Sequence, residues 1–494
     1  MPAEIWMVAA EAAPLAQAGG LGDVLRALPA ALAARGFTVR RFLPAYGCVD
    51  RAGFDREEMN LAVPLGPARV PVRFLSRTDP GGTVTTLVVC EELFAREGIY
   101  GPPGGEYENN ARRFTLLCRA VCERARRADA PPGILHVHDW HAALAPLFVR
   151  FTEGWRRRPR TVLTIHNMGY QGRFGPEEID WLSLPAAALR QAFHSGGIED
   201  HGGLNFLKAG VAYADHLTTV SPTHAREILA APFGWGLDGI LRQRASDLTG
   251  ILNGADYDVW DPAADPRLPR PYGPGSLDRK EEARRALGDK LGLTAGRRPL
   301  LGVVGRLVPQ KGIDILAAAA PALLQDGADL AVLGSGDPGV AGALADLQRR
   351  HPGRIGLHLA FDDDLAHLVV AGCDLLLVPS RYEPCGLVQM HALRYGTIPV
   401  VHRTGGLADT VRDERTAPGR GTGFVFEPLL PETLAGAVRS ALSLRAADPE
   451  AWRALQRRAM AEDFSWARAA ALYAELYRDL LGREPVPVPG PGGS

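Results

Sequence analysis

Two cations stand five positions apart in the segment Val303–Gly312, Arg306 and Lys311. The apolar residues before them are typical of a buried strand, so both side chains are expected on the loop and helix start that follow. Fixed positive charge in such a place suits a diphosphate, because a diphosphate gains negative charge when it leaves during a group transfer. A helix-capping loop with solvent-facing cations fits the same residues equally well.

A carboxylate follows another apolar run, in the segment Pro379–Leu387. Open α/β sheets bind their ligands at the carboxyl ends of their strands, where Glu383 is expected. Its carboxylate could accept hydrogen bonds from sugar hydroxyls or stabilise positive charge on a reacting sugar carbon. The alternative is a structural glutamate that the dipole of the following helix favours.

The pattern Gly-Gly-Leu-x-Asp occurs twice, at Gly19–Asp23 and at Gly405–Asp409. Each copy follows an apolar run and precedes a helical stretch. Glycine lets the backbone approach a ligand closely, and the free N–H groups of the helix start attract an anion. One copy alone would favour an ordinary turn, but one copy in each half favours two nucleotide-type α/β domains that face a shared cleft.

Histidines gather after two expected strands of the first half. His136 and His138 share one face of a strand because alternate residues point the same way, whereas His141 is expected to begin a helix. A hydrogen-bonded cleft edge is therefore favoured over a metal site. His166, with Asn167 and other polar residues after it, fits a sugar-binding rim or a buried core histidine.

Both halves alternate short apolar runs with longer helical patterns, which indicates βαβ units and parallel sheets. The fold class is therefore α/β, with two doubly wound, Rossmann-like domains. The expected strands are Ile5–Ala10, Val39–Leu43, Val84–Val89, Ile134–Val137, Thr161–Ile165, His216–Val220, Leu300–Val304, Leu330–Leu333, Ile355–Leu359, Leu375–Val378 and Ile398–Val401.

The proline, glycine and aspartate residues between the halves indicate a linker. The expected domains are residues 1–250 and 277–465, joined by a linker at 251–276. A terminal helix is expected at 466–481, and the proline- and glycine-rich tail at 484–494 is expected to be disordered.

The composition restricts the partners. The 494-residue chain has 55 basic and 56 acidic side chains and a formal net charge of −1, so no global field attracts nucleic acid or an anionic membrane. Cys118 and Cys122 have helical spacing, but no second pair completes a zinc set. No apolar stretch approaches the roughly 20 residues of a membrane helix. These features favour a cytoplasmic protein with reduced thiols.

The motifs together closely resemble those of the bacterial glycogen synthase and starch synthase family. The resemblance covers nearly the whole chain in order and omits only the tail. The motifs that carry it are Gly98–Gly101, His138–His141, Ser221–Thr223, Ile251–Asp256, Gly305–Gly312, Pro379–Leu387, Arg394–Thr397 and Thr404–Thr410. Many relatives of wider GT-B architecture carry a second glutamate eight positions after the first, and His391 in that position fits the synthase branch better.

The resemblance implies a GT-B fold, with two Rossmann-like domains, the active site between them and the last helix returning to the first domain. It also implies metal-independent transfer of glucose from ADP-glucose to the non-reducing end of an α-1,4-glucan (glycogen), with retained anomeric configuration and no cofactor.

The resemblance also implies roles for individual residues. Arg306 and Lys311 would hold the diphosphate, Glu383 would lie at the glucose, and His166 would lie beside the reacting carbon. The remaining substrate-binding positions are Gln17, Gly19, Gly20, Asp23, Tyr100, Asp139, Asn167, Asn253, Cys385, Gly386, Leu387, Thr404, Gly405 and Gly406.

The chemistry agrees with these roles. A retaining transferase could form a covalent carboxylate intermediate, but no suitably placed second acid is evident in the first half. A dissociative transfer on the same face needs only an oriented donor and acceptor and a stabilised diphosphate.

One position departs from the family pattern. The first glycine loop usually begins Lys-x-Gly-Gly-Leu, and here Gln17 replaces the lysine. Losing one charge-assisted hydrogen bond costs about 1.5–3 kcal/mol, or roughly ten- to a hundredfold in rate or affinity. The alternatives are therefore a related glucosyltransferase with another acceptor, or a weakly catalytic glucan-binding relative.

Overall fold

The computed structural model describes residues 4–483 except 103, 195, 295 and 297. The chain divides into two compact units. The first unit comprises residues 4–220, 225–251 and 466–483, and the second comprises 221–224 and 252–465. The disorder predicted for 484–494 lies outside the described residues.

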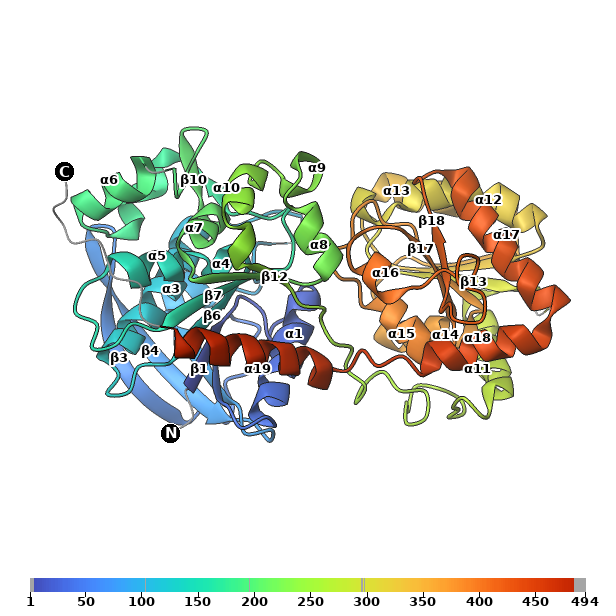
Figure 1. Ribbon diagram of the computed structural model, residues 1–494, viewed down its shortest axis with the longest axis horizontal. Coiled ribbons are helices and arrows are strands. Elements are labelled where there is room, and N and C mark those ends of the chain that lie inside the picture. The colour runs from blue at the N-terminus through green and yellow to red at the C-terminus, as the bar shows by residue number, and fades with distance from the viewer. Residues whose placement is uncertain (1–3, 103, 195, 295, 297, 484–494) are drawn as a thin grey trace. The chain divides into compact units, whose positions relative to one another are not determined.

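The first unit is built on a largely parallel sheet (Figure 1). Its strands, in spatial order, are β12 (Leu248–Gly250), β11 (His216–Thr219), β7 (Arg160–Ile165), β6 (Ile134–His138), β1 (Glu4–Val8), β2 (Thr38–Pro44), β5 (Val84–Val89), β4 (Ala68–Thr78) and β3 (Arg56–Leu65). A small separate sheet holds β8 (Arg173–Phe174), β10 (Gly203–Asn205) and β9 (Glu199–Asp200). The helices of the unit are α1 (Gly20–Ala33), α2 (Glu91–Phe94), α3 (Asn110–Arg127), α4 (Asp139–Ala142), α5 (Leu144–Phe151), α6 (Ala186–His194), α7 (Phe206–Tyr213), α9 (Ala231–Gly234), α10 (Asp238–Gln243) and α19 (Trp466–Gly482).

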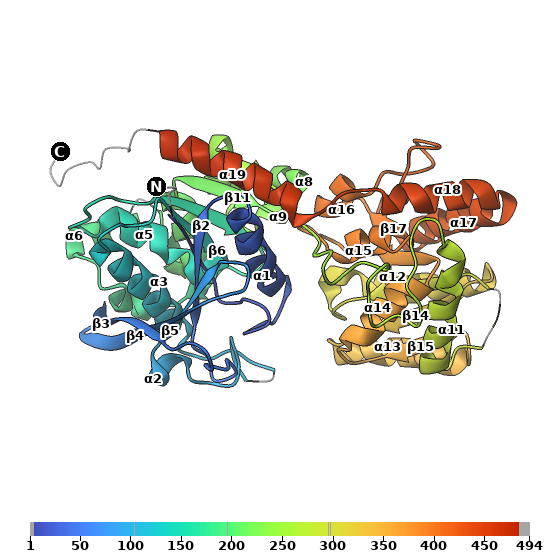
Figure 2. The ribbon, with the colours of Figure 1, turned by 90° about the horizontal axis from the view of Figure 1, so that it is seen from below.

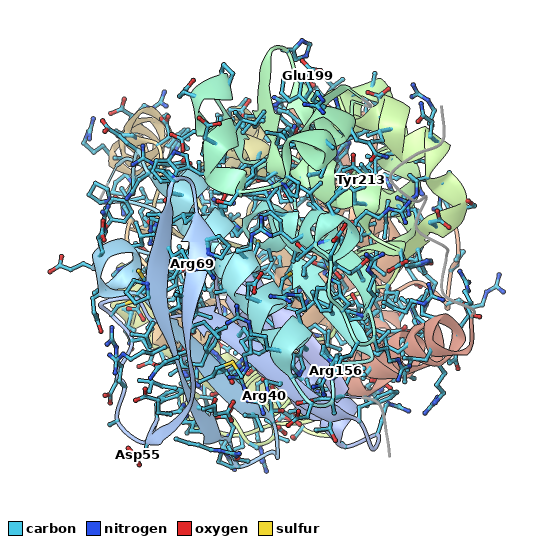
Figure 3. The ribbon with its side chains drawn as sticks, turned by 90° about the vertical axis from the view of Figure 1, so that its left-hand side faces the viewer. Arg40, Asp55, Arg69, Arg156, Glu199 and Tyr213 are labelled. Carbon is cyan, nitrogen blue, oxygen red and sulfur yellow. The ribbon has the colours of Figure 1, made fainter. Side chains whose placement is uncertain are left out.

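The antiparallel hairpin of β3 and β4 at the edge of this sheet was not predicted. Its strands alternate exposed and buried residues and carry many charges, because only one face packs on the core. Figure 3 shows the hairpin from the side, with Arg69 on β4. The continuous apolar runs that revealed the buried parallel strands are absent from such a pattern.

Helix α19 packs beside α1, as Figures 1 and 2 both show. Its residues Trp466, Tyr473 and Tyr477 are buried in the core of the first unit. The hydroxyl of Tyr477 lies 2.7 Å from Nδ1 of His136 on β6. Helix α19 is thus part of the first unit.

The second unit has a parallel sheet with helices on both sides (Figure 2). Its strands, in spatial order, are β15 (Ile355–His358), β14 (Asp329–Leu333), β13 (Leu300–Val304), β16 (Leu375–Val378), β17 (Ile398–His402) and β18 (Phe424–Phe426). Its helices are α11 (Lys280–Leu291), α12 (Ile313–Gln325), α13 (Pro338–Arg350), α14 (Asp363–Gly372), α15 (Val388–Arg394), α16 (Gly405–Thr410), α17 (Pro431–Ala447) and α18 (Pro449–Met460), and α8 (Pro222–Glu227) begins in it.

The segment predicted as a linker packs on the second unit. Leu268 and Tyr272 are buried in its core, and the Tyr272 hydroxyl donates to the carbonyl of Tyr395 at 2.9 Å. Proline and glycine prevent regular structure in this segment but allow it to pack, which composition alone does not reveal. Within the described residues, no helix has the length and apolar character needed to cross a membrane.

Candidate active site

The polar residues of the first unit lie where β1, β6 and β7 end. Parallel strands bring their carboxyl ends to one edge of the sheet, so residues far apart in sequence meet there. Asp139 follows β6 directly and has a left-handed backbone, with φ of 56°. This conformation is uncommon outside glycine and turns the chain sharply from the strand into α4.

The carboxylate of Asp139 joins the ends of two neighbouring strands. Its Oδ1 accepts the backbone N–H of His166, which follows β7, at 2.7 Å. The backbone of Asn167 lies near this carboxylate and favours its charged form. Burial raises the Asp139 pKa to about 7, and the nearby charge of Glu11 acts in the same direction. Asp139 therefore holds the loop that carries His166.

A second contact joins the same strands through their histidines. Nδ1 of His138 lies 3.0 Å from Nε2 of His166. The ring of His136 lies 4.2 Å from that of His138, and Nε2 of His136 lies 2.6 Å from the hydroxyl of Thr164. His138 and His166 are thus joined by a hydrogen bond, His136 packs against His138, and His141 stacks instead on Tyr100 at 4.7 Å. Among the described residues, no group of three metal-ligating side chains is assembled.

The first glycine loop is held by an acid that the sequence analysis missed. Glu11 lies just beyond β1, and its Oε2 accepts the backbone N–H groups of Ala18 at 2.7 Å and Gly19 at 2.8 Å. Its Oε1 accepts the hydroxyl of Tyr100 at 2.5 Å. Two of the N–H groups expected to face an anion are therefore bound by Glu11. Its position directly after an apolar strand is the feature of the sequence that could have indicated this role.

The other predicted residues of this loop make different contacts. Gln17 is exposed, and its Nε2 donates to the carbonyl of Gly19 at 3.3 Å. Gly20 opens α1, and Asp23 in the first turn lies 3.5 Å from the guanidinium of Arg26. The side chain of Gln17 is therefore hydrogen-bonded within its own loop.

The second unit joins Lys311 and Glu383 in an ion pair. The Lys311 Nζ donates to Oε2 of Glu383 at 2.6 Å, and the buried Ser380 hydroxyl donates to the same oxygen at 2.9 Å. Glu383 is 6% exposed. A group predicted to bind diphosphate and one predicted to bind glucose are thus in direct contact.

A close approach of two loops makes this pair possible. Gly312 has φ of 64°, and a Cβ there would lie 1.9 Å from the carbonyl oxygen of Pro379. Only glycine allows the end of the Lys311 loop to lie against the segment that leads to Glu383. Arg306, by contrast, is exposed, and its guanidinium makes no hydrogen bond or ion pair with any described residue.

The second glycine loop packs on the backbone around Glu383. The N–H of Gly406 donates to the Glu383 carbonyl at 3.0 Å, and a Cβ at Gly406 would lie 2.1 Å from the carbonyl oxygen of Cys385. Thr404 is the N-cap residue of α16, and Gly405 opens that helix. This loop and the Glu383 segment therefore form one rigid surface.

The turn after Glu383 completes this surface. Gly386 has φ of 71°, and Leu387 is the N-cap residue of α15. Cys385 is buried, and burial raises its pKa to about 12, which leaves a neutral thiol rather than a nucleophile. The backbone of Asn253 contacts this thiol, and the buried Asn253 Oδ1 has no partner among the described residues.

The two aspartates of the repeated motif have different contacts. Whereas Asp23 lies beside Arg26, Asp409 accepts the backbone N–H of Thr223 at 2.7 Å and its hydroxyl at 2.6 Å. Ser221 donates to the carbonyl of Pro384 at 2.6 Å. Asp409 thus fixes residues 221–224 within the second unit.

His391 is a structural residue. Its ring stacks on Trp260 at 3.9 Å, and His367 stacks on the same indole at 3.6 Å. Burial lowers the pKa of His391 to about 3, so the ring is neutral at pH 7. The stack attaches the segment around Trp260 to the second unit.

An exposed aromatic residue at the same edge was also missed. Phe361 follows β15 and is 87% exposed. It precedes three aspartates, Asp362–Asp364. An aromatic residue beside such a charged run is the feature of the sequence that could have indicated an exposed ring.

Comparisons with known proteins agree with this arrangement. Residues 4–243 match the family described as Starch synthase catalytic domain, and residues 290–459 match Glycosyl transferases group 1. The glycogen synthase of Anaeromyxobacter dehalogenans (strain 2CP-C) is 46% identical over 97% of this chain and 99% of that protein. The glycogen synthase of Rhodospirillum rubrum is 43% identical over 97% of this chain and 99% of that protein.

Two solved structures are similar in fold. The catalytic domain of Starch Synthase IV from Arabidopsis thaliana, bound to ADP and acarbose, matches with a TM-score of 0.89 and 32% identity, over 98% of this chain and 100% of that one. Sucrose-phosphate synthase from Thermosynechococcus elongatus matches with a TM-score of 0.59 and 20% identity, over 97% of this chain and 99% of that one. This second match shows a shared fold alone.

We predict that acid destabilises the first unit. Burial lowers the pKa values of His136 and His166 to about 3 and those of His138 and His141 well below their usual value. Between pH 6.5 and 3 the unfolded chain therefore binds more protons, and the free energy of unfolding falls as the pH drops. Each histidine contributes ~1 kcal/mol per pH unit, and the raised pKa of Asp139 offsets one of the four below pH 7.

Urea unfolding at pH 7, 6 and 5 measures this effect. The midpoint should fall at each step, and the variant His201→Asn, which changes an exposed histidine, should show the same decrease. A midpoint that stays constant from pH 7 to 5 would contradict the prediction.

Proposed function

Because this chain belongs to the glycogen and starch synthase family of glycosyltransferases, we propose that it transfers glucose from ADP-glucose to the non-reducing end of an α-1,4-glucan, with retained anomeric configuration. The family and the GT-B class predicted from the motifs are confirmed by the comparisons.

The observation that carries the proposal is the group of charges at the carboxyl edge of the second unit. The Arg306 guanidinium has no partner among the described residues, and the ammonium of Lys311, five positions later, is paired with the Glu383 carboxylate. A diphosphate would bind first to the unpaired guanidinium and would compete with Glu383 for Lys311. Both cations would then stabilise the negative charge that develops on the leaving diphosphate.

We assign Glu383 to the sugar side of this site. Its carboxylate is buried and is fixed by Lys311 and Ser380, so it can accept sugar hydroxyls or stabilise positive charge on the reacting carbon. Phe361 is assigned to the nucleotide base, because an aromatic ring that is 87% exposed at the end of β15 offers a stacking surface.

The acids of the first unit favour transfer without a covalent intermediate. Two acids of this unit, Glu11 and Asp139, lie at the carboxyl edge of its sheet, and hydrogen bonds hold both. Glu11 accepts two backbone N–H groups and a hydroxyl, and Asp139 accepts the N–H of His166. Carboxylates bonded in this way are held as positioning groups and are weak nucleophiles. We therefore propose a dissociative transfer on one face of the sugar.

We assign further predicted residues to substrate contacts at the two edges. In the first unit we assign Asp23 and Asn167 to substrate contacts and Tyr100 to the acceptor side. In the second unit the backbone of Gly405 and Gly406 would contact the diphosphate.

The experiment that tests the proposed function is nucleotide release with glycogen and no added metal, with ADP-glucose compared with UDP-glucose. ADP release coupled to growth of the glucan is expected. Binding of glucan without nucleotide release would instead indicate a non-catalytic relative. Nucleotide release with a product other than glucan would indicate another acceptor.

Lys311 and Glu383 should affect different kinetic constants. Lys311→Ala removes a charge-assisted contact worth about 1.5–3 kcal/mol, so the KM for ADP-glucose should rise roughly ten- to a hundredfold while glucan affinity stays constant. Glu383→Gln keeps the shape and removes the charge, so kcat should fall about tenfold or more.

Steady-state kinetics with each substrate varied in turn measures both effects, with Lys290→Ala as the control at an exposed lysine of the same unit. Equal effects of Lys311→Ala on donor and glucan would refute its assignment to the diphosphate. Near-normal turnover of Glu383→Gln would exclude an essential carboxylate.

Gln17 should limit the rate if the family lysine binds the donor. Gln17→Lys supplies a charge in the first glycine loop, so kcat/KM should increase by up to roughly ten- to a hundredfold. Gln325→Lys, which adds the same charge at an exposed position of α12, is the control. An unchanged kcat/KM would mean that the loop already compensates for the missing charge.

A further inference from the structure

His138 is enclosed on all sides at the end of β6. Its side chain is fully buried, and the ring of His136 lies 4.2 Å from it. Both nitrogens of His136 are already bonded, Nδ1 to the hydroxyl of Tyr477 and Nε2 to that of Thr164. Among the described residues, the side chain of His138 therefore has one polar contact, from its Nδ1 to Nε2 of His166 at 3.0 Å.

This environment determines which nitrogen of His138 carries the proton. Burial lowers the pKa of His138 well below its usual value, so the ring is neutral and has one N–H. Nε2 of His138 is buried and has no partner among residues 4–483 that the structure describes. A buried N–H without an acceptor is rarer and costlier than a bare lone pair. The proton therefore lies on Nδ1 and is donated to Nε2 of His166.

The proton position of His166 follows from this bond. Its Nε2 accepts, and burial lowers its pKa to about 3, so the single proton of the neutral ring lies on Nδ1. Nδ1 of His166 is not among the buried unpartnered atoms and bonds to no described residue. It is therefore accessible at the edge of the sheet. The backbone N–H of His166 is held by Asp139 as well.

We propose that His138 is a positioning residue that fixes His166 in the tautomer with its proton on Nδ1, so that His166 presents an N–H donor to an oxygen of the bound sugar. The sugar part of this inference rests on the proposed function. The tautomer itself does not, and it can be measured without turnover.

The first test uses the unmodified protein. Nitrogen-15 NMR of histidine-labelled full-length chain at pH 7, with the His166 signals assigned by their loss in His166→Gln, distinguishes protonated from unprotonated ring nitrogens. A protonated Nδ1 and an unprotonated Nε2 are expected for His166. The opposite tautomer in the unmodified protein would overturn the proposal, whatever the activity.

The second test removes the donor and then restores it. His138→Phe keeps a flat ring without a donor, so His166 should become a mixture of tautomers and kcat should fall about tenfold. His138→Asn places an amide N–H near the position of Nδ1, so it should restore the single tautomer and kcat to within about threefold. The control His216→Asn changes a histidine on β11 that bonds to Thr249, and both readouts should stay unchanged.

The outcomes separate the two proposals. A single Nδ1–H tautomer that persists in His138→Phe, or equal loss of kcat in the Phe and Asn variants, would overturn the role of His138. A tautomer that changes as expected in a chain without transferase activity would support the positioning role and refute the proposed function.

Discussion

The bond between the carboxylate of Asp139 and the backbone N–H of His166 determines the geometry of the first unit's edge. The sheet brings the ends of β6 and β7 close, but it does not fix the loops beyond them. The left-handed backbone at Asp139 turns its carboxylate towards the neighbouring strand, and one 2.7 Å bond then orients the loop after β7. Burial of this acid disfavours its charged form, as its raised pKa shows. Such groups are typical of functional sites, where the orientation of a loop matters.

The second unit reaches the same precision by close backbone contact. Glycines at 312 and 406 let two loops lie against the segment around Glu383, at distances that exclude any side chain. The ion pair of Lys311 and Glu383 depends on this packing. The first unit thus orients its edge with buried carboxylates, and the second orients it with glycines.

Much of the fold could be predicted from the sequence, because buried parallel strands are continuous apolar runs and β5, β13 and β16 have the expected bounds. The β3–β4 hairpin was missed because its half-exposed strands lack such runs. The site residues were named, but their pairing was not. Lys311 and Glu383 are far apart in sequence, and only the parallel sheet brings them together. Glu11 was overlooked because it binds backbone N–H groups of the loop. Every residue has such a group, so the residue types of the loop do not reveal this partner.

The stack of Trp260 between His367 and His391 limits which residues position 391 can hold without a loss of stability. By the motif resemblance, position 391 corresponds to a second glutamate of many proteins of wider GT-B architecture, and here the His391 ring lies 3.9 Å from that of Trp260. A glutamate at this position would bury a carboxylate against that indole and would remove one of the two rings that stack on it among the described residues. The substitution His391→Glu alone is therefore expected to lower the stability of the second unit.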